Sequence, residues 1–267
     1  MVNYHDWAKY SPKETQAHKK PTHIDLAAFK IGDVYTAFCY AKLNNDCYNY
    51  ISQKENISSK TQLFLRASFL QNVTFYLNSC IDYFWQMLYA YCQKDEEKLY
   101  EHNEHEKVSE QESLTTEIDK LIAYGQSLGE DFNIISDIKK EIDALITKTQ
   151  IRQIFNYLKH RGQYAIRGLG DNSKVAFEKL GICVMFQPSN SNVLYACPPN
   201  KLLYREELDL DKTHQNISRF MDEFSDKFDK LIKTVIPADY ICRKQTGIDS
   251  ILSNFDLSII DEVINGL

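Results

Sequence analysis

The sequence predicts an all-α protein, an up-down helical bundle with a small β-hairpin insertion around residues 175–196. Apolar residues recur every three or four positions along most of the chain, which is the spacing of one helix face. One segment, about residues 60–92, keeps this spacing without any Gly or Pro. The chain of 267 residues is 43% hydrophobic and 25% charged, as in ordinary globular proteins, and we expect a single helical domain over residues 22–267.

The N-terminal residues 1–21 are mainly polar, and we expect them to form a flexible arm. Thr22 is suited to cap a first helix, which is predicted over about residues 23–52. A second helix is predicted to begin at Ser59, because Gln62 follows it at the spacing of a capping box.

The second predicted helix, about residues 60–92, is apolar on more than one face, which indicates a helix at the centre of the bundle. Its tyrosines would also suit a platform on which bases stack. Arginines are not interleaved with them, however, so packing in a core or in a dimer is the favoured interpretation. Because the apolar surface exceeds what one flank of a bundle needs, we expect a homodimer.

The later helices are predicted by the same spacing. One covers about residues 114–127, and another runs without interruption from about 131 to a stop at Gly162. An amphipathic helix over about residues 210–236 ends at Pro237, and a short helix over about residues 248–264 follows.

The predicted hairpin rests on a change of pattern between residues 173 and 205. The polar hexapeptide 187–192 separates two short apolar runs, residues 183–186 and 193–196. A polar stretch rich in Ser and Asn between two such runs is typical of a turn between paired strands.

Charge and hydropathy exclude several classes of partner. The net charge is −6, which disfavours general affinity for nucleic acid or anionic membranes, although a local basic stripe remains possible. The first residues lack a basic region followed by an apolar core, and no stretch of about 18 apolar residues occurs. We therefore expect a cytoplasmic protein with no membrane partner.

Metal and cofactor sites are not expected. The seven cysteines contain no Cys-x-x-Cys pair and mostly lie within apolar patterns, which favours reduced core thiols over disulfides or zinc ligands. His102 and His105 lie in a highly charged segment, 93–112, that offers little packing to hold three or four ligands. We predict no metal and no cofactor.

The most informative feature for function is the segment from Asn156 to Gly162, at the end of the helix predicted to stop there. It combines an amide, an amine and an imidazole on a helix whose other side is apolar. Imidazole titrates near neutral pH, and the basic residues concentrate positive charge in an otherwise acidic protein. The candidate residues on this polar side are Arg152, Asn156, Lys159, His160, Arg161 and Arg167.

This arrangement resembles the motif of the HEPN superfamily, helical domains of bacterial defence and toxin systems and of nucleotidyltransferase partners. In that family an arginine precedes a histidine by four to six residues, and the residue after the arginine is often asparagine. Asn156, three further residues and His160 match the second half of the pattern, whereas Phe155 occupies the place of the arginine. The resemblance extends over about residues 23–236, but only the short motif is specific.

For active members the resemblance implies metal-independent RNA cleavage, in which the histidine moves a proton and the arginine stabilises phosphate charge. His160 and Asn156 are then the candidate catalytic residues. The candidate RNA- or phosphate-binding residues are Arg152, Lys159, Arg161 and Arg167. Because the arginine is replaced, we expect a non-catalytic protein of a bacterial defence or stress system that binds RNA or a protein partner.

Two alternatives stay open. One is a helical protein-interaction module without an active site, in which His160 only sits near the negative end of a helix dipole. The other is a metal-independent endoribonuclease that uses His160 and takes phosphate stabilisation from Lys159 or Arg161.

Overall fold

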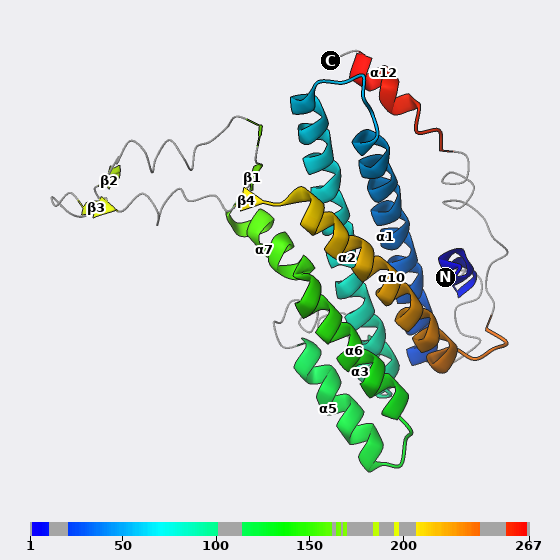
Figure 1. Cartoon of the computed structure of the whole chain (residues 1–267). Helices are drawn as coiled ribbons and strands as arrows, with labels where there is room; N and C mark the ends of the chain where they lie inside the picture. Colours follow the sequence, from blue (N-terminus) through cyan, green and yellow to red (C-terminus); the bar gives the residue numbers. More distant parts are fainter. Residues whose placement is uncertain are drawn as a thin grey trace.

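The computed structural model confirms the all-α prediction, since helices make up more than half of the chain. It describes residues 2–10, 21–100, 114–161, 164–166, 168–169, 184–186, 195–197, 207–240 and 255–265. The α-helices are α1 (Thr22–Ser52), α2 (Ser59–Cys92), α3 (Glu96–Tyr100), α5 (Leu114–Ser127), α6 (Asn133–Thr149), α7 (Ile151–Arg161), α10 (Leu210–Val235) and α12 (Ile259–Asn265). The longer helices run up and down along one another as a bundle (Figure 1).

Helix α2 lies at the centre of the bundle, as predicted. It packs along the full length of α1 and also contacts α5, α7 and α10 (Figure 1). Leu70, Leu77 and Phe84 of α2 are fully buried. The apolar character of α2 on several faces is therefore explained by four neighbouring helices within one chain.

The turn between α1 and α2 is closed by side chains, but not by those predicted. The cap of α2 is Ser58, whose Oγ accepts the backbone N–H of Thr61 at 3.1 Å. Gln62 does not turn back to its own helix. Its Nε2 donates to the carbonyls of Ile51 and Lys54, at 3.1 and 3.0 Å, and so satisfies the C-terminal end of α1.

The prediction of a flexible arm was wrong for residues Tyr4–Tyr10, which form a 3-10 helix, η1. Trp7 of η1 is fully buried, with its ring 4.9 Å from that of Phe228 and 5.4 Å from that of Phe38. A tryptophan inserted between α1 and α10 anchors this segment, although the surrounding residues are polar. Thr22 is the first residue of α1 and not its cap, since Pro21 stands at the cap position without a side-chain bond.

The long helix predicted from residue 131 to Gly162 is broken at Gln150. This residue has φ 60°, in the left-handed region, and its N–H bonds to the carbonyl of Ile146 at 3.1 Å. Helix α6 ends before it and α7 begins after it. The break lets α6 pack on α10 while α7 turns to pack on α2, which one straight helix would not do.

The predicted hairpin is present: β2 (Val184–Phe186) pairs antiparallel with β3 (Tyr195–Cys197). A second sheet was not predicted. There β1 (Ala165–Ile166), just after α7, pairs in parallel with β4 (Glu207–Leu208), just before α10. This short ladder joins the C-terminal end of α7 to the N-terminal end of α10.

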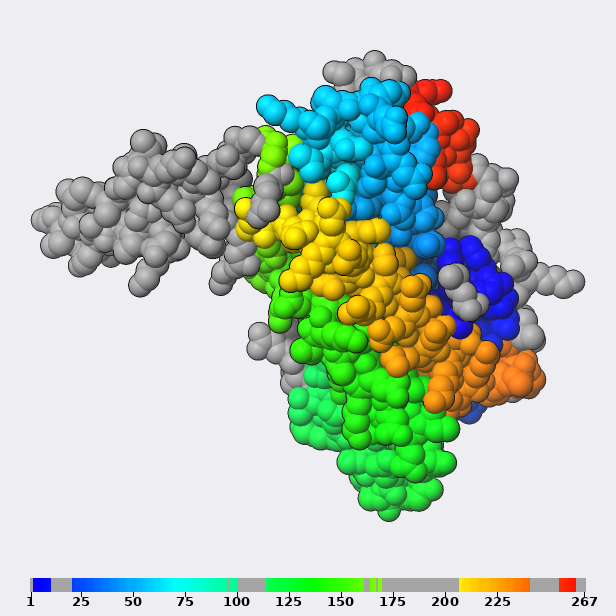
Figure 2. Space-filling view, in the orientation of Figure 1, coloured from blue at the N-terminus to red at the C-terminus, as the bar shows by residue number. Residues whose placement is uncertain are grey.

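Helix α10 crosses one face of the molecule, coloured yellow to orange in Figure 2, between the blue and cyan segments of α1 and α2 and the green segments of α6 and α7. It ends at Val235, before Pro237, as predicted. Helix α12 overlaps the C-terminal part of the helix predicted over about residues 248–264. Its Asp261 accepts from Tyr50 of α1 at 2.9 Å and from Lys54, just after α1, at 2.8 Å. Among the described helices, none combines the length and the apolar character needed to cross a bilayer.

Candidate functional site

The predicted site lies on α7, an amphipathic helix of 11 residues. Ile151, Ile154 and Tyr157 are buried against the bundle, whereas Asn156, Lys159 and His160 are exposed. Within the described part of the chain, no side-chain hydrogen bond or ion pair is made by these three exposed residues. They are therefore free to meet a partner from solution.

Arg152 does not join this exposed group. Its guanidinium bonds to Asp82 at 2.7 Å and to Asn78 at 3.3 Å, and it lies 4.6 Å from the ring centroid of Trp85. Eight residues of helix separate it from His160, which is about 12 Å along the axis. Arg152 is therefore held by its own partners on α2, and its predicted part in binding RNA or phosphate stays a prediction. The side chain of Arg161, and Arg167 as a whole, lie outside the described residues.

An aromatic row, defined here as Tyr40, Tyr76, Phe75 and Phe155, lies beside the exposed residues of α7. The ring of Phe155 is 5.9 Å from that of Phe75, which is 5.4 Å from that of Tyr76. Tyr76 stacks on Tyr40 at 5.1 Å. Phe75 and Tyr40 are 53% and 41% exposed, so the row is accessible at the surface. The sequence did not predict the row because its members come from α1, α2 and α7.

A second polar cluster is found where α1, α2 and α10 meet. The guanidinium of Arg66 bonds to the Tyr48 hydroxyl at 2.5 Å and to the carboxylate of Asp211, and the imidazole of His214 stacks on Tyr48 at 4.3 Å. Arg66 and Asp211 also line a pocket of about 260 Å³ beside the β1–β4 ladder. Nε of Arg66 and Nε2 of His214 are buried without a hydrogen-bond partner in the described residues.

This cluster makes stability sensitive to pH. Burial lowers the pKa of His214 below its usual 6.5, and the positive charge of Arg66 lowers the pKa further. The unfolded chain therefore binds a proton more readily, and the free energy of unfolding should fall as the pH drops below about 6.5. In His214→Phe, which keeps a ring on Tyr48, the decline between pH 7 and pH 5 should be less steep in denaturant titrations. If the free energy of unfolding falls equally steeply with pH in the parent and in His214→Phe, His214 is not the group that causes the pH dependence.

The thiols that the structure describes are buried and suited to packing. Cys39, Cys47, Cys80 and Cys92 are unpaired, and burial raises the pKa of Cys39 and of Cys92 to about 12. Thiols of this kind are poor nucleophiles and poor metal ligands at neutral pH. No group of three His, Cys, Asp or Glu side chains suited to a metal occurs among the described residues, which exclude His102 and His105.

Comparison of the chain with protein-family models, with curated proteins and with solved structures finds no match. The resemblance of Asn156 and His160 to the HEPN motif therefore stays a prediction. What the structure adds is the surroundings of these residues, namely an exposed turn of α7 next to the aromatic row, with Arg152 bound to Asp82.

Proposed function

We propose that the protein is a non-catalytic, HEPN-like RNA-binding protein of a bacterial defence or stress system. The RNA-binding surface consists of Asn156, Lys159 and His160 on α7 together with the aromatic row. The observation that carries this proposal is the position of Lys159 and His160, exposed and unpaired among the described residues, one helical turn from Phe155.

The chemistry of this surface suits single-stranded RNA. A lysine ammonium contacts phosphate, and exposed rings stack on unpaired bases with little dependence on sequence. Phe75 offers an exposed ring, and Lys159 and Phe155 lie four positions apart, on the same side of α7. Because the net charge of the chain is −6, binding depends on this local group and should be weak at high salt.

Binding without cleavage is favoured by the position of Arg152. Metal-independent cleavage in the HEPN manner requires an arginine and a histidine at one phosphate. Arg152 is fixed to Asp82 and Trp85, and Phe155 stands where the motif has arginine. Of the candidate arginines, Arg152 is thus held away from His160 by its own partners. Cleavage of RNA that disappears in His160→Ala, with binding intact, would instead support the endoribonuclease alternative.

Lys159→Ala should weaken binding of a labelled single-stranded RNA and reduce the dependence of log K on log salt by about 1, because one phosphate contact is lost. Fluorescence anisotropy at several salt concentrations measures both quantities. Lys140→Ala is the matched control, since Lys140 is an exposed lysine on α6, outside this surface. Equal losses of RNA affinity in Lys159→Ala and Lys140→Ala would show that only the net charge of the protein affects binding, and would contradict a site on α7.

The interaction module remains the second candidate, because exposed Phe75 and Tyr40 would suit a protein partner as well as bases. A second copy of the chain is the simplest such partner, in line with the expected homodimer. Light scattering at micromolar concentration tests this: Phe75→Ala should shift a dimer toward monomer. If the parent protein binds no RNA at low salt, the interaction module replaces the RNA-binding proposal.

A further inference from the structure

Arg152 and Lys159 lie on the same side of α7, about two turns apart, with Phe155 and Asn156 between them along the helix. About 10 Å of helix axis separates the two cations, so they suit different phosphates of one RNA strand. Bases between those phosphates would meet the rings of Phe155 and Phe75, which are 5.9 Å apart. The position of Arg152 therefore fits an extension of the RNA-binding surface along α7.

The ion pair of Arg152 uses only one nitrogen of its guanidinium. Nη1 donates to Asp82 at 2.7 Å and to Asn78 at 3.3 Å. Among the described residues, no hydrogen bond is made by Nη2 or Nε. The side chain is 38% exposed, which leaves room for a ligand at this open edge. Nη2 and Nε together form the fork that binds two oxygens of one phosphate.

Trp85 holds the guanidinium in place independently of Asp82. Cζ of Arg152 lies 4.6 Å from the centroid of the Trp85 ring. That ring is itself fixed, because its N–H donates to Asp143 of α6 at 3.2 Å. A guanidinium stacked on an aromatic face keeps its edges available for hydrogen bonds. Little conformational entropy is therefore lost when Arg152 binds a phosphate.

Asp82 also affects the charge that a phosphate would meet. Its carboxylate lies beside the guanidinium and offsets part of the positive charge of Arg152. Both side chains are 38% exposed, so water screens this pair and the offset is incomplete. The carboxylate thus weakens the binding of a further anion at the open edge without preventing it.

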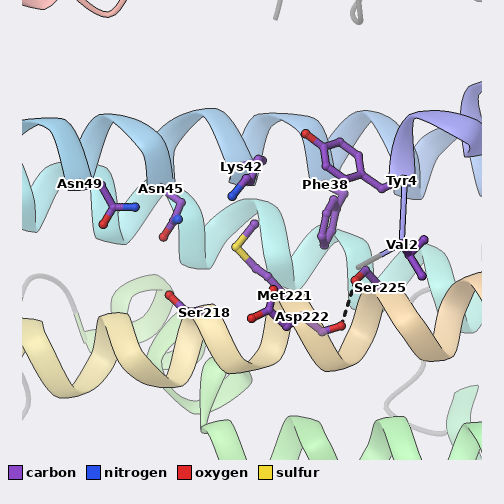
Figure 3. A pocket seen from close by; sticks show the side chains of 10 residues that line it. All are labelled: Val2, Tyr4, Phe38, Lys42, Asn45, Asn49, Ser218, Met221, Asp222 and Ser225. Atoms are coloured by element: carbon purple, nitrogen blue, oxygen red, sulfur yellow. Dashed lines mark hydrogen bonds between the residues drawn. The ribbon is translucent and has the colours of Figure 1, made fainter. Parts of the chain in front are cut away.

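Two pockets of the bundle contain a cation but do not suit phosphate. Figure 3 shows one of about 290 Å³, in which side chains of α1, among them Asn45, face those of α10. Its Lys42 lies 3.5 Å from Asp46 and shares the lining with Asp222. In the pocket beside the β1–β4 ladder, Arg66 shares the lining with three acidic residues. Carboxylates in both places would repel a phosphate.

We propose that Arg152 binds a second phosphate of the RNA strand through Nη2 and Nε, while Nη1 stays on Asp82, and that the Asp82 carboxylate limits the affinity. This inference rests on the proposed function, because it extends the RNA-binding surface of α7. It gives Arg152 no part in cleavage, since Arg152 and His160 contact different phosphates.

Asp82→Asn separates this role from a purely structural one. Asparagine keeps an acceptor for Nη1 and removes the negative charge, so the affinity for a labelled single-stranded RNA should rise about two- to fivefold at low salt, the size of an exposed charge interaction. If the ion pair only anchors α7 to α2, loosening it should weaken RNA binding. Asp137→Asn is the matched control for net charge, since Asp137 is exposed on α6. A fall in affinity, or a rise no larger than in Asp137→Asn, would overturn the proposal.

Two substitutions of Arg152 test the contact itself by fluorescence anisotropy at several salt concentrations. Arg152→Gln should lower the RNA affinity about tenfold at low salt and reduce the dependence of log K on log salt by about 1. Arg152→Lys should lower the affinity but keep the salt dependence, because the charge remains and the fork is lost. In Arg152→Gln combined with Lys159→Ala, the salt dependence should fall by about 2, since two separate phosphate contacts are lost.

The outcomes distinguish this inference from the proposed function. RNA binding that depends on Lys159 but is unchanged in Arg152→Gln would overturn the inference alone. The inference also fails if the salt dependence of the double variant falls no further than that of Lys159→Ala, because Arg152 then acts only by holding α7 in place. Absence of RNA binding by the parent protein at low salt would overturn both.

Discussion

Trp7→Ala should lower the free energy of unfolding by about 3–5 kcal/mol, as for other large aromatic side chains removed from a core. Trp7 is fully buried, and its ring packs edge-on against Phe228 at 4.9 Å and against Phe38 at 5.4 Å. Its indole N–H donates to the Asp229 carboxylate at 3.3 Å. The alanine variant leaves a cavity between α1 and α10 that the surrounding helices cannot close.

Urea titration of the parent and the variant measures this loss. Trp7→Phe is the control, since it keeps a ring between the helices and loses the hydrogen bond and part of the volume, and it should cost less than the alanine change. If Trp7→Ala lowers the free energy of unfolding by less than about 0.5 kcal/mol, the range of surface substitutions, then Trp7 is not packed in the core and residues 4–10 form a flexible arm.

Phe224→Ala should be equally destabilising, by about 3–5 kcal/mol. Phe224 is fully buried on α10, stacked between Phe220 at 5.3 Å and Phe228 at 5.4 Å. Its ring also lies 6.2 Å from that of Phe38 of α1 and 6.1 Å from that of Phe84 of α2. One side chain thus joins three helices, and its removal weakens each of these contacts.

The matched control is Phe75→Ala, the same chemical change on α2 at a ring that is 53% exposed. It should alter the free energy of unfolding by no more than about 0.5 kcal/mol. If Phe75→Ala and Phe224→Ala lower the free energy of unfolding by similar amounts, Phe224 is not buried and Phe75 exposed as described.

The helices themselves could largely be predicted from local sequence. The spacing of Phe220, Phe224 and Phe228 defines the buried side of α10, and Pro237 marks where that helix must stop. A long apolar run without Gly or Pro was enough to predict α2 and its central place. Helix periodicity is a local property, because residues three and four apart share a face whatever the rest of the chain does.

The candidate site was predicted only in part. Exposure of Asn156, Lys159 and His160 follows from the amphipathic pattern of α7, and the structure agrees. The distance of Arg152 from His160 along the helix follows from the eight residues between them, but the pairing of Arg152 with Asp82 and Trp85 could not be predicted, because these partners are about 70 residues away in sequence. Nor could the aromatic row or the pocket beside Asn45, since their residues come from separate elements.

By itself, then, the sequence determined the helical class, the central helix, the end of α10 and the exposed side of α7. Tertiary structure alone decided that Trp7 is buried, that the chain breaks at Gln150 and that β1 pairs with β4. Each of these depends on contacts between residues far apart in the chain. The local pattern around Gln150 favours a continuous helix, and only the separate contacts of α6 with α10 and of α7 with α2 stabilise a left-handed residue between them.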